Sequence, residues 1–192
     1  MLNRLKNYRV ILASCSPRRK ELLNGLGIDF EVCVIPHIDE SYPEELNPKE
    51  VPCHIAKKKA DAYHAKANEL IITADTVVIL NDSILEKPAD RNNAIRMLQK
   101  LSGRKHDVIT GVVISTFNKQ TSFFVQSSVD FAVLTDEEII YYVDHFHPFD
   151  KAGAYGIQEW IGYIGVRGIE GSFYNVMGLP VQRLYQELKR FV

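Results

Sequence analysis

The chain has few cysteines and no paired cysteine motif. Its 192 residues include only Cys15, Cys33 and Cys53, and no two of them have the C-x-x-C spacing. An odd number of such cysteines indicates neither a disulfide framework nor a zinc ribbon. The histidines also lack the spacing of metal ligands, since His145 and His147, for example, lie two residues apart. A reducing compartment is the simplest setting, and we expect a cytoplasmic protein.

Long apolar runs and a charge excess are missing as well. No apolar stretch approaches the roughly 20 residues of a membrane span, and residues 1–8 are charged and polar where a signal peptide needs an apolar core. The net charge is only −1, whereas domains that coat nucleic acid usually carry a broad basic excess. We therefore expect neither membrane nor nucleic acid as a partner. With 46% hydrophobic residues, the chain can form one well-packed core, and we predict a single domain over residues 1–192.

Two common nucleotide-binding signatures are absent. The chain has no Walker A sequence, and no glycine-rich dinucleotide fingerprint follows its first apolar run. These absences count against P-loop kinases and NTPases and against dehydrogenases of the dinucleotide-binding type. Any phosphate site must therefore use another arrangement.

What the chain does carry is a cationic helix start directly after an apolar run. Val10–Ala13 predicts a buried strand, and Ser16 predicts the N-cap of a helix over Pro17–Leu26 with proline in its first position. Free N–H groups and the positive end of the helix dipole attract phosphate. Arg18 and Arg19 add positive charge where acids would suit the helix better, so a polyphosphate would offset their repulsion. An ordinary capped helix with a solvated basic end is the alternative.

Strands and helices alternate along the rest of the chain. Apolar and alternating runs predict strands over Phe30–Ile35, Leu70–Ala74, Val77–Leu80, His106–Thr116, Thr121–Leu134 and Ile161–Ile169. Periodicity and caps predict helices over Lys49–Asn68, from Asp90 to Leu101, from a capping box at Thr135 to Phe146, and from Pro180 onward. The pattern predicts an α/β fold built on a mixed, twisted sheet flanked by helices.

Polar residues follow three of the expected strands. They are Ser14, Ser16, Arg18 and Arg19 after the first, Asp39 and Glu40 after the second, and Asp75 and Thr76 after the third. Loops at such strand ends tend to converge. Cations there suit phosphate oxygens, and paired carboxylates suit a divalent metal that also binds those oxygens. The set predicts phosphoryl-group chemistry, although Asp75 by itself is equally compatible with a strand-end acid that makes turn hydrogen bonds.

Three further residues stand out in their local patterns. Lys59 interrupts the apolar stripe of the predicted helix Lys49–Asn68, so it needs a partner or a ligand. Lys87 lies in a turn, where a solvated charge is the ordinary interpretation. Gln158 closes a glycine-punctuated loop and is either a polar loop residue or a reader of a base edge through its donor and acceptor pair.

Seven sequence blocks, in one order along nearly the whole chain, carry a family resemblance. They are Leu12-Ala13-Ser14-x-Ser16-Pro17-Arg18-Arg19-x-Glu21-Leu22-Leu23, Ala56-x-x-Lys59-Ala60, Ala74-Asp75-Thr76-Val77-Val78, Lys87-Pro88, Leu101-Ser102-Gly103-Arg104-x-His106, Lys151-Ala152-Gly153-Ala154-Tyr155-Gly156-Ile157-Gln158 and Val176-Met177-Gly178-Leu179-Pro180. In these blocks the chain resembles the Maf family of nucleoside triphosphate pyrophosphatases. The resemblance implies a Maf and inosine triphosphatase-like architecture. It also implies hydrolysis between the α- and β-phosphates with Mg²⁺ or Mn²⁺, and it is compatible with a homodimer.

The resemblance also implies roles for individual residues. Asp75 takes the place of the general base, and Arg18, Thr76 and Gln158 stand where the family sets its base preference. This trio is similar to the subfamily that acts on dTTP and UTP, and less similar to the one that acts on 7-methyl-GTP. The implied products are the monophosphate and pyrophosphate.

These roles combine with the charges into one predicted site. We expect Arg18, Arg19, Lys59 and Lys87 to hold the triphosphate, with Ser14 and Ser16 in the same loop. Asp75 and Glu40 are the predicted metal ligands, and Asp39 is the alternative to Glu40. The predicted catalytic residues are Asp75, Glu40 and Lys87.

Three positions depart from the family pattern, and two other functions fit the same charges. Thr73 and Glu86 replace glycines, and Glu159-Trp160 follows Gln158 where a smaller turn is common, which we expect to alter closure of the base pocket. A non-catalytic nucleotide-binding regulator of cell division is the alternative from another class. A phosphatase that removes single phosphates is distinguished only by its product.

Overall fold

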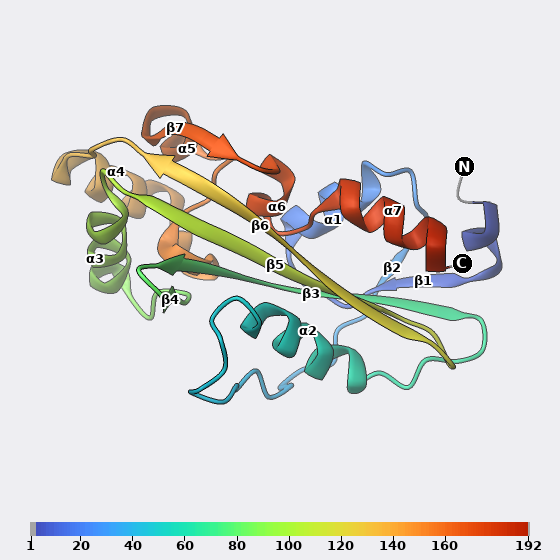
Figure 1. The fold of residues 1–192 in the computed structure, drawn as a ribbon. Coiled ribbons are helices and arrows are strands. Elements are labelled where there is room, and N and C mark those ends of the chain that lie inside the picture. Colours follow the sequence, from blue (N-terminus) through green and yellow to red (C-terminus); the bar gives the residue numbers. More distant parts are fainter. Residues whose placement is uncertain (1–2, 192) are drawn as a thin grey trace. The chain divides into compact units, whose positions relative to one another are not determined.

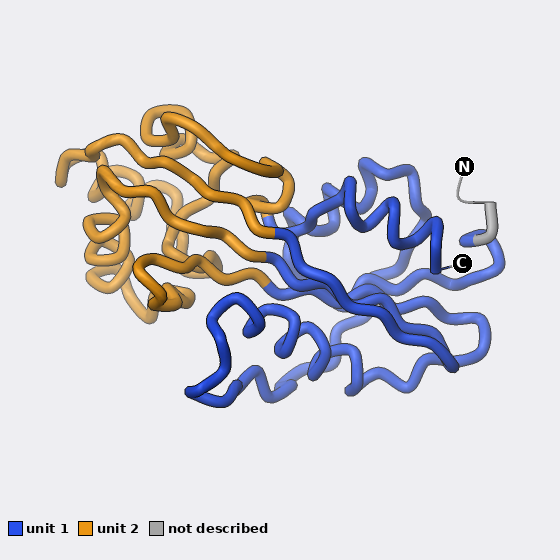
Figure 2. The backbone as a smooth tube through the Cα atoms, in the orientation of Figure 1, with its two compact units in different colours: residues 1–75, 110–125, 178–192 blue, residues 76–109, 126–177 orange. Residues whose placement is uncertain are grey.

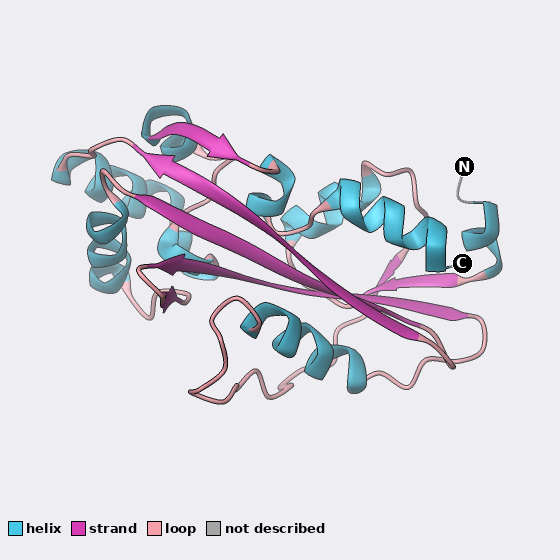
Figure 3. Ribbon diagram, in the orientation of Figure 1, coloured by secondary structure: helices cyan, strands magenta, loops and turns pink. Residues whose placement is uncertain are grey.

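The computed structural model describes residues 3–191 and contains helices and one mixed sheet (Figures 1 and 3). Over these residues the strand order is β2-β1-β3-β5-β6-β7, and β4 pairs with β3. The strands are β1 (Arg9–Leu12), β2 (Glu31–Val32), β3 (Glu69–Leu80), β4 (Ser83–Leu85), β5 (Lys105–Ser115), β6 (Gln120–Phe131) and β7 (Val166–Glu170). Strand β1 is parallel to β2 and β3, whereas β4 and β7 are antiparallel to β3 and β6. The predicted mixed α/β sheet is confirmed.

The helices complete the described chain. They are α1 (Pro17–Asn24), α2 (Val51–Asp61), α3 (Arg91–Leu101), α4 (Asp136–Phe146), α5 (Trp160–Gly165), α6 (Phe173–Met177) and α7 (Val181–Phe191), with 3-10 turns η1 (Asn3–Asn7), η2 (Pro148–Asp150) and η3 (Ala152–Ala154). Within residues 3–191, none of these helices combines the length and the apolar character that crossing a bilayer requires.

The chain divides into two compact units (Figure 2). The first contains residues 1–75, 110–125 and 178–192, and the second contains residues 76–109 and 126–177. The division falls between Asp75 and Thr76, inside β3. The single domain over residues 1–192 stays a prediction, and residues 1, 2 and 192 lie outside the described part.

In the first unit, helices cover both faces of the strands. Helix α2 lies on one face, and α1 and α7 lie on the other (Figure 1). Ala56 and Ala60 of α2 pack with Val113 of β5 in one buried cluster. Gly111 permits this close approach, because a Cβ there would lie 2.4 Å from the backbone nitrogen of Cys53. The close packing fixes the height of α2 over the strands.

The register of β1 and β3 places the end of β1 beside the middle of β3. The pairing ends with Leu12 opposite Ile72, and the N–H of Ala13 still donates to the carbonyl of Ile72 over 2.9 Å. Both strands are almost wholly buried, as parallel strands covered by helices are. The loop after β1 therefore begins beside the part of β3 that carries Asp75.

The second unit is built around α3, α4 and the far ends of the long strands. Helix α3 packs against α4, and the guanidinium of Arg91 forms an ion pair with Asp144. Both helices begin as predicted: Asp90 accepts a hydrogen bond from the N–H of Asn93, and both bonds of the capping box at Thr135 are present. Local capping chemistry therefore locates these two helix starts.

Five predicted elements need correction. The predicted strand Phe30–Ile35 shortens to an exposed pair of residues, β2, and the two predicted halves around Asp75 form the continuous strand β3. The predicted helix Lys49–Asn68 ends at Asp61. The first part of the predicted strand Ile161–Ile169 is helix α5 instead, and only Val166–Glu170 is strand. Apolar periodicity alone does not distinguish a short buried helix from a strand.

Candidate functional site

The loop between β1 and α1 has the capped geometry that the sequence predicts. The hydroxyl of Ser16 accepts a hydrogen bond from the N–H of Arg19 over 3.4 Å, and Pro17 is the first helical residue. The N–H of Ser16 in turn donates to the hydroxyl of buried Ser14 over 3.2 Å. No acidic residue occupies the first turn of α1. No acid of the turn itself therefore offsets the positive helix end, which suits an anion.

Arg19 ties this loop to two other segments of the first unit. Its Nε donates to the carbonyl of Gly178 over 2.8 Å, and its Nη1 donates to the carbonyl of Ala74 over 2.9 Å and to the Ser14 hydroxyl over 3.4 Å. Burial lowers the pKa of the Arg19 guanidinium, while the negative charge of Asp75 acts in the opposite direction. Arg19 therefore fixes the loop beside the strand that carries Asp75.

Lys59 and two predicted metal ligands form one cluster. The Lys59 ammonium lies 2.9 Å from Oδ1 of Asp75 and 3.1 Å from Oε1 of Glu40. The side chains of Lys59 and Asp75 are each 14% exposed, and that of Glu40 is half exposed. The prediction that a lysine on the packed face of α2 needs a partner is confirmed. A nearly buried ion pair of this kind is well placed to act on a charged ligand.

Asp39 contacts Lys58, whereas Glu40 contacts Lys59. Its carboxylate accepts from the ammonium of Lys58 and from the backbone N–H and hydroxyl of Ser41. The hydrogen bond with Lys58, helped by those of Ser41, holds the pKa of Asp39 well below its usual range. Of the two neighbouring acids, the structure places Glu40, and not Asp39, in contact with the partner of Asp75.

The donor set of this cluster fits Mg²⁺ or Mn²⁺ shared with a substrate. Carboxylate oxygens of Asp75 and Glu40 lie within 3.1 Å of one ammonium nitrogen, so one cationic position serves both acids. Mg²⁺ is usually held by one or two carboxylates together with substrate phosphates and water. Across residues 3–191, no group of three His, Cys, Asp or Glu side chains forms a metal cage by itself. The residues therefore suit a metal that arrives with phosphate.

Three predicted site residues belong to the second unit. Thr76 follows Asp75 directly on β3, and Lys87 is exposed in the loop after β4. Gln158 is half-buried, and its carbonyl oxygen Oε1 is fully buried with no hydrogen-bond partner among the described residues. A buried polar atom without a partner needs an explanation, such as a ligand that donates to it. That Thr76, Lys87 and Gln158 meet the cluster of the first unit stays a prediction.

A network around Glu159 supports the loop that carries Gln158, and the sequence did not reveal it. The hydroxyl of buried Tyr142 donates to Oε2 of Glu159 and accepts from the N–H of Gly156 over 2.9 Å. The ammonium of Lys151 lies 3.1 Å from Oε1 of Glu159 and 2.7 Å from Asp150. Tyr142 has the apolar spacing of an ordinary helix core residue, so only the departure at Glu159 pointed here.

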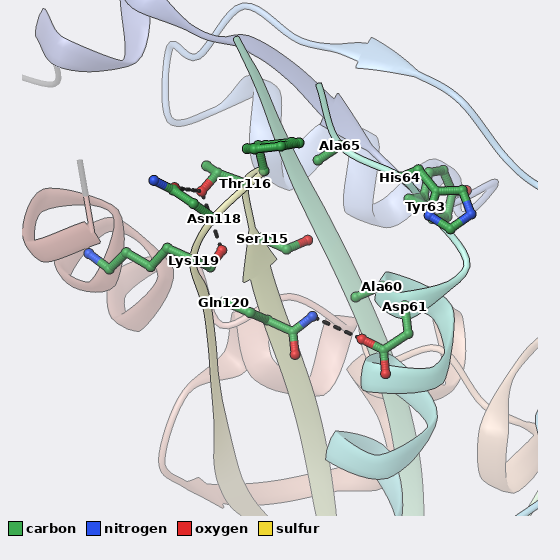
Figure 4. Close-up of a pocket in the computed structure, with 11 residues that line it drawn as sticks. Ala60, Asp61, Tyr63, His64, Ala65, Ser115, Thr116, Asn118, Lys119 and Gln120 are labelled. Atoms are coloured by element: carbon green, nitrogen blue, oxygen red, sulfur yellow. Dashed lines mark hydrogen bonds between the residues drawn. The ribbon is translucent and has the colours of Figure 1, made fainter. Parts of the chain in front are cut away.

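One pocket of the first unit is lined by residues that the sequence does not predict as site residues. Its volume is about 520 Å³, and none of the predicted site residues lines it. The lining residues are Ala60, Asp61, Tyr63, His64, Ala65, Ser115, Thr116, Phe117, Asn118, Lys119 and Gln120. The amide of Gln120 donates to Asp61 across its wall (Figure 4). The cluster of Lys59 and Asp75 therefore does not line this pocket.

Comparisons with known proteins extend the residue-level resemblance to the whole chain. The family model described as Maf-like protein matches residues 9–191. A dTTP/UTP pyrophosphatase of Parabacteroides distasonis is 60% identical over the full length of both chains. Another, from Bacteroides thetaiotaomicron, is 56% identical over 99% of this chain and 100% of its own.

Solved structures of more distant proteins share the fold alone. The HAM1 protein of Coxiella burnetii matches with a TM-score of 0.52 at 15% identity, over 95% of this chain and 99% of its own. The Ham1 protein of Staphylococcus aureus matches with a TM-score of 0.50 at 18% identity, over 93% and 99%. These matches confirm the predicted inosine triphosphatase-like architecture. The family model covers nearly every residue and each of the seven blocks, and the chain therefore belongs to the Maf family.

Proposed function

We propose that this protein is a nucleoside triphosphate pyrophosphatase that hydrolyses dTTP and UTP to the monophosphate and pyrophosphate. The observation that carries the proposal is the contact of Lys59 with both Asp75 and Glu40. The Arg19 guanidinium binds the carbonyl of Ala74, the residue before Asp75, so the cationic loop lies beside this cluster. Full-length relatives with 53–60% identity bear the name dTTP/UTP pyrophosphatase, which supports the same substrates for this chain.

The cations of the site would bind the triphosphate. An ammonium has three N–H donors. Lys59 donates one to Asp75 and forms an ion pair with Glu40 over 3.1 Å, and it would donate another to a phosphate oxygen. Arg18, Arg19 and Lys87 would add positive charge, and the hydroxyls of Ser14 and Ser16 and the N–H groups of α1 would bind oxygens. Phosphoryl transfer depends mainly on such positioning and charge neutralisation.

Asp75 would act as the general base. Its Oδ1 is held by Lys59, so its orientation is fixed and Oδ2 is available to accept a proton from the attacking water. That water would form the new bond to the α-phosphorus, and the bond to the pyrophosphate oxygen would break. A bound Mg²⁺ or Mn²⁺, held by Asp75 and Glu40, would supply Lewis-acid polarisation of the phosphate. Lys87 would stabilise negative charge on the leaving pyrophosphate.

Gln158 would read the base. A uracil or thymine ring offers the N3–H donor beside the O4 acceptor, which matches the carbonyl and NH₂ of one amide. The buried Oε1 of Gln158, which has no partner among the described residues, supports this role because N3–H would supply the missing donor. Thr76 and Arg18 would complete the base preference.

The products of a substrate panel test the proposal. The purified chain is incubated with Mg²⁺ or Mn²⁺ and dTTP, UTP, CTP, 7-methyl-GTP or ITP, and pyrophosphate and orthophosphate are measured separately. We expect pyrophosphate from dTTP and UTP above the other nucleotides. Orthophosphate would indicate a phosphatase instead, and binding without turnover would indicate a nucleotide-binding regulator. The Asp75→Asn variant, purified identically, controls for a contaminating hydrolase.

We also propose that the protein acts on free nucleotides in the cytoplasm, without a membrane or nucleic-acid partner. The low net charge and the three cysteines support this setting. A homodimer is compatible with the role, and analytical ultracentrifugation of the full chain measures it directly.

A further inference from the structure

The amide of Gln158 and the carboxylate of Glu159 pack against the same glycine. A Cβ at Gly156 would lie 3.0 Å from Nε2 of Gln158 and 2.9 Å from Oε2 of Glu159. Both side chains therefore lie close to the same point beside this glycine. The amide nitrogen of Gln158 faces this shared position, while its carbonyl Oε1 is the buried atom that lacks a partner among the described residues.

Glu159 is itself held firmly. One carboxylate oxygen accepts from the Tyr142 hydroxyl, and the other lies 3.1 Å from the Lys151 ammonium. Its backbone N–H donates to the carbonyl of Gly156 over 3.0 Å, and its own carbonyl accepts from Gly162 over 2.8 Å. Tyr142 is wholly buried and the Lys151 side chain is 8% exposed, so the position of this carboxylate is set by the interior of the second unit.

A fixed negative charge at this position matters because an amide is nearly symmetric in shape. A half-turn about the last side-chain bond of glutamine exchanges its oxygen with its nitrogen. One orientation matches uracil and thymine, whose N3–H donates and whose O4 accepts. The other matches cytosine, whose N3 accepts and whose amino group donates. Glutamine therefore discriminates between these bases only if its surroundings fix the amide.

We propose that Glu159 is a positioning residue that fixes the amide of Gln158 and thereby sets the preference for uracil and thymine over cytosine. A carboxylate attracts the positive NH₂ end of an amide and repels its carbonyl oxygen. Glu159 therefore keeps Nε2 on its own side and leaves Oε1 to accept from N3–H. The inference rests on the proposed reading of the base by Gln158.

The neutral variant Glu159→Gln tests this role. It keeps the size of the side chain and an acceptor for Tyr142, but it removes the charge that orients the amide. We expect the ratio of kcat/KM for UTP to that for CTP to fall about tenfold, mainly through better use of CTP, with kcat for UTP changed less than about twofold. Glu170→Gln is the matched control, because this exposed carboxylate of the same unit contacts Lys105. Its ratio should equal that of the unchanged protein.

The variant Gln158→Ala separates failure of the inference from failure of the proposed function. If Gln158→Ala lowers the ratio and Glu159→Gln does not, the inference is overturned and the proposed base reading stands. If neither variant moves the ratio, Gln158 does not read the base and both fail.

Two further measurements keep the test valid if Glu159→Gln unfolds. Tyr142→Phe removes the hydroxyl that donates to Glu159 and accepts from the N–H of Gly156, and we expect a smaller fall of the same ratio. Titration calorimetry of UMP and CMP reports base preference without turnover, and equal relative affinities in Tyr142→Phe and the unchanged protein would count against the inference.

Discussion

The ammonium of Lys59 lies within 3.1 Å of oxygens from both Asp75 and Glu40. Lys59 comes from α2 and Asp75 from β3, so the contact joins a helix to the strand that it covers. Two carboxylates that approach one point repel each other unless a cation lies between them. Lys59 supplies that cation, and a metal that enters the site must share or take over its position.

Replacement of Asp75 by asparagine should abolish most turnover while nucleotide binding persists. The amide keeps the size of the side chain but cannot take a proton from water, so we expect kcat to fall about 10²–10⁴-fold. Pyrophosphate release and UTP affinity are measured on the same preparation. Asp61→Asn, at the exposed end of α2, is the matched control and should retain activity. Turnover of Asp75→Asn near that of the control would remove Asp75 from the role of base.

Replacement of Lys59 by methionine should strengthen metal binding and still lower activity. Without the ammonium, Asp75 and Glu40 have no counter-charge at their shared position, and a divalent cation relieves their repulsion. We expect Mn²⁺ alone to raise the melting temperature of Lys59→Met more than that of the unchanged protein. Lys58→Met is the control, because its ammonium contacts Asp39 instead. Equal Mn²⁺ responses in all three proteins would contradict the shared cation position.

The neighbouring acids Asp39 and Glu40 should differ in their effect on metal dependence. Glu40→Gln removes a proposed metal ligand, so the Mg²⁺ concentration at half-maximal activity should rise about tenfold or more. Asp39→Asn removes a carboxylate that contacts Lys58 and Ser41, so it should leave that concentration unchanged. A larger rise for Asp39→Asn than for Glu40→Gln would assign the metal to Asp39.

Sequence reasoning succeeded where the signal is local and failed where tertiary contacts decide. The caps at Ser16, Asp90 and Thr135 are determined by neighbouring residues, and all three are present in the structure. The end of α2 at Asp61 was missed, since no glycine or proline marks it. Apolar spacing predicts a strand where helix α5 lies, because the start of this helix depends on contacts of Glu159 and Gly156.

The contacts of the candidate site also differ in whether the sequence predicts them. A lysine on an apolar helix face requires a partner, so the contact of Lys59 could be anticipated. The contacts of Arg19 with the carbonyls of Ala74 and Gly178 could not, because a carbonyl acceptor leaves no trace in the side-chain sequence. The hydrogen bond of the Tyr142 hydroxyl could not be anticipated for another reason: its ring fits the apolar pattern of α4, which indicates an ordinary core residue.

Thr73 should stabilise the contact between the strand of Asp75 and the helix of Lys59. Its hydroxyl is fully buried and donates to the carbonyl of Ala56 over 2.7 Å. Thr73→Val keeps the shape and removes the bond, so we expect a loss of about 1 kcal/mol in the free energy of unfolding, measured with urea. Thr121→Val is the control, because it makes the same substitution at a half-buried position of strand β6. Equal stability of Thr73→Val and the unchanged protein would show that this bond contributes nothing net.

His106 should make the protein less stable in mild acid. The residue is 3% exposed, and its ring packs edge-on against Phe131 and Tyr155. Its Nε2 shares a hydrogen bond of 2.8 Å with the Tyr155 hydroxyl. Burial lowers the pKa of His106 from 6.5 to about 4. Between these values the unfolded chain binds a proton that the folded protein does not, so stability is complete above pH 6.5 and is lost as the pH falls toward 4.

The size of this loss gives the test. From pH 7 to pH 5 the free energy of unfolding should fall by about 2 kcal/mol more in the unchanged protein than in His106→Gln, which has no titrating ring. His64→Gln is the matched control, because His64 is exposed and its removal should leave the steeper pH dependence intact. Parallel curves for His106→Gln and the unchanged protein would mean that His106 accepts its proton equally well in both states. The buried ring would then have access to solvent, and its contact with Tyr155 would not hold it neutral.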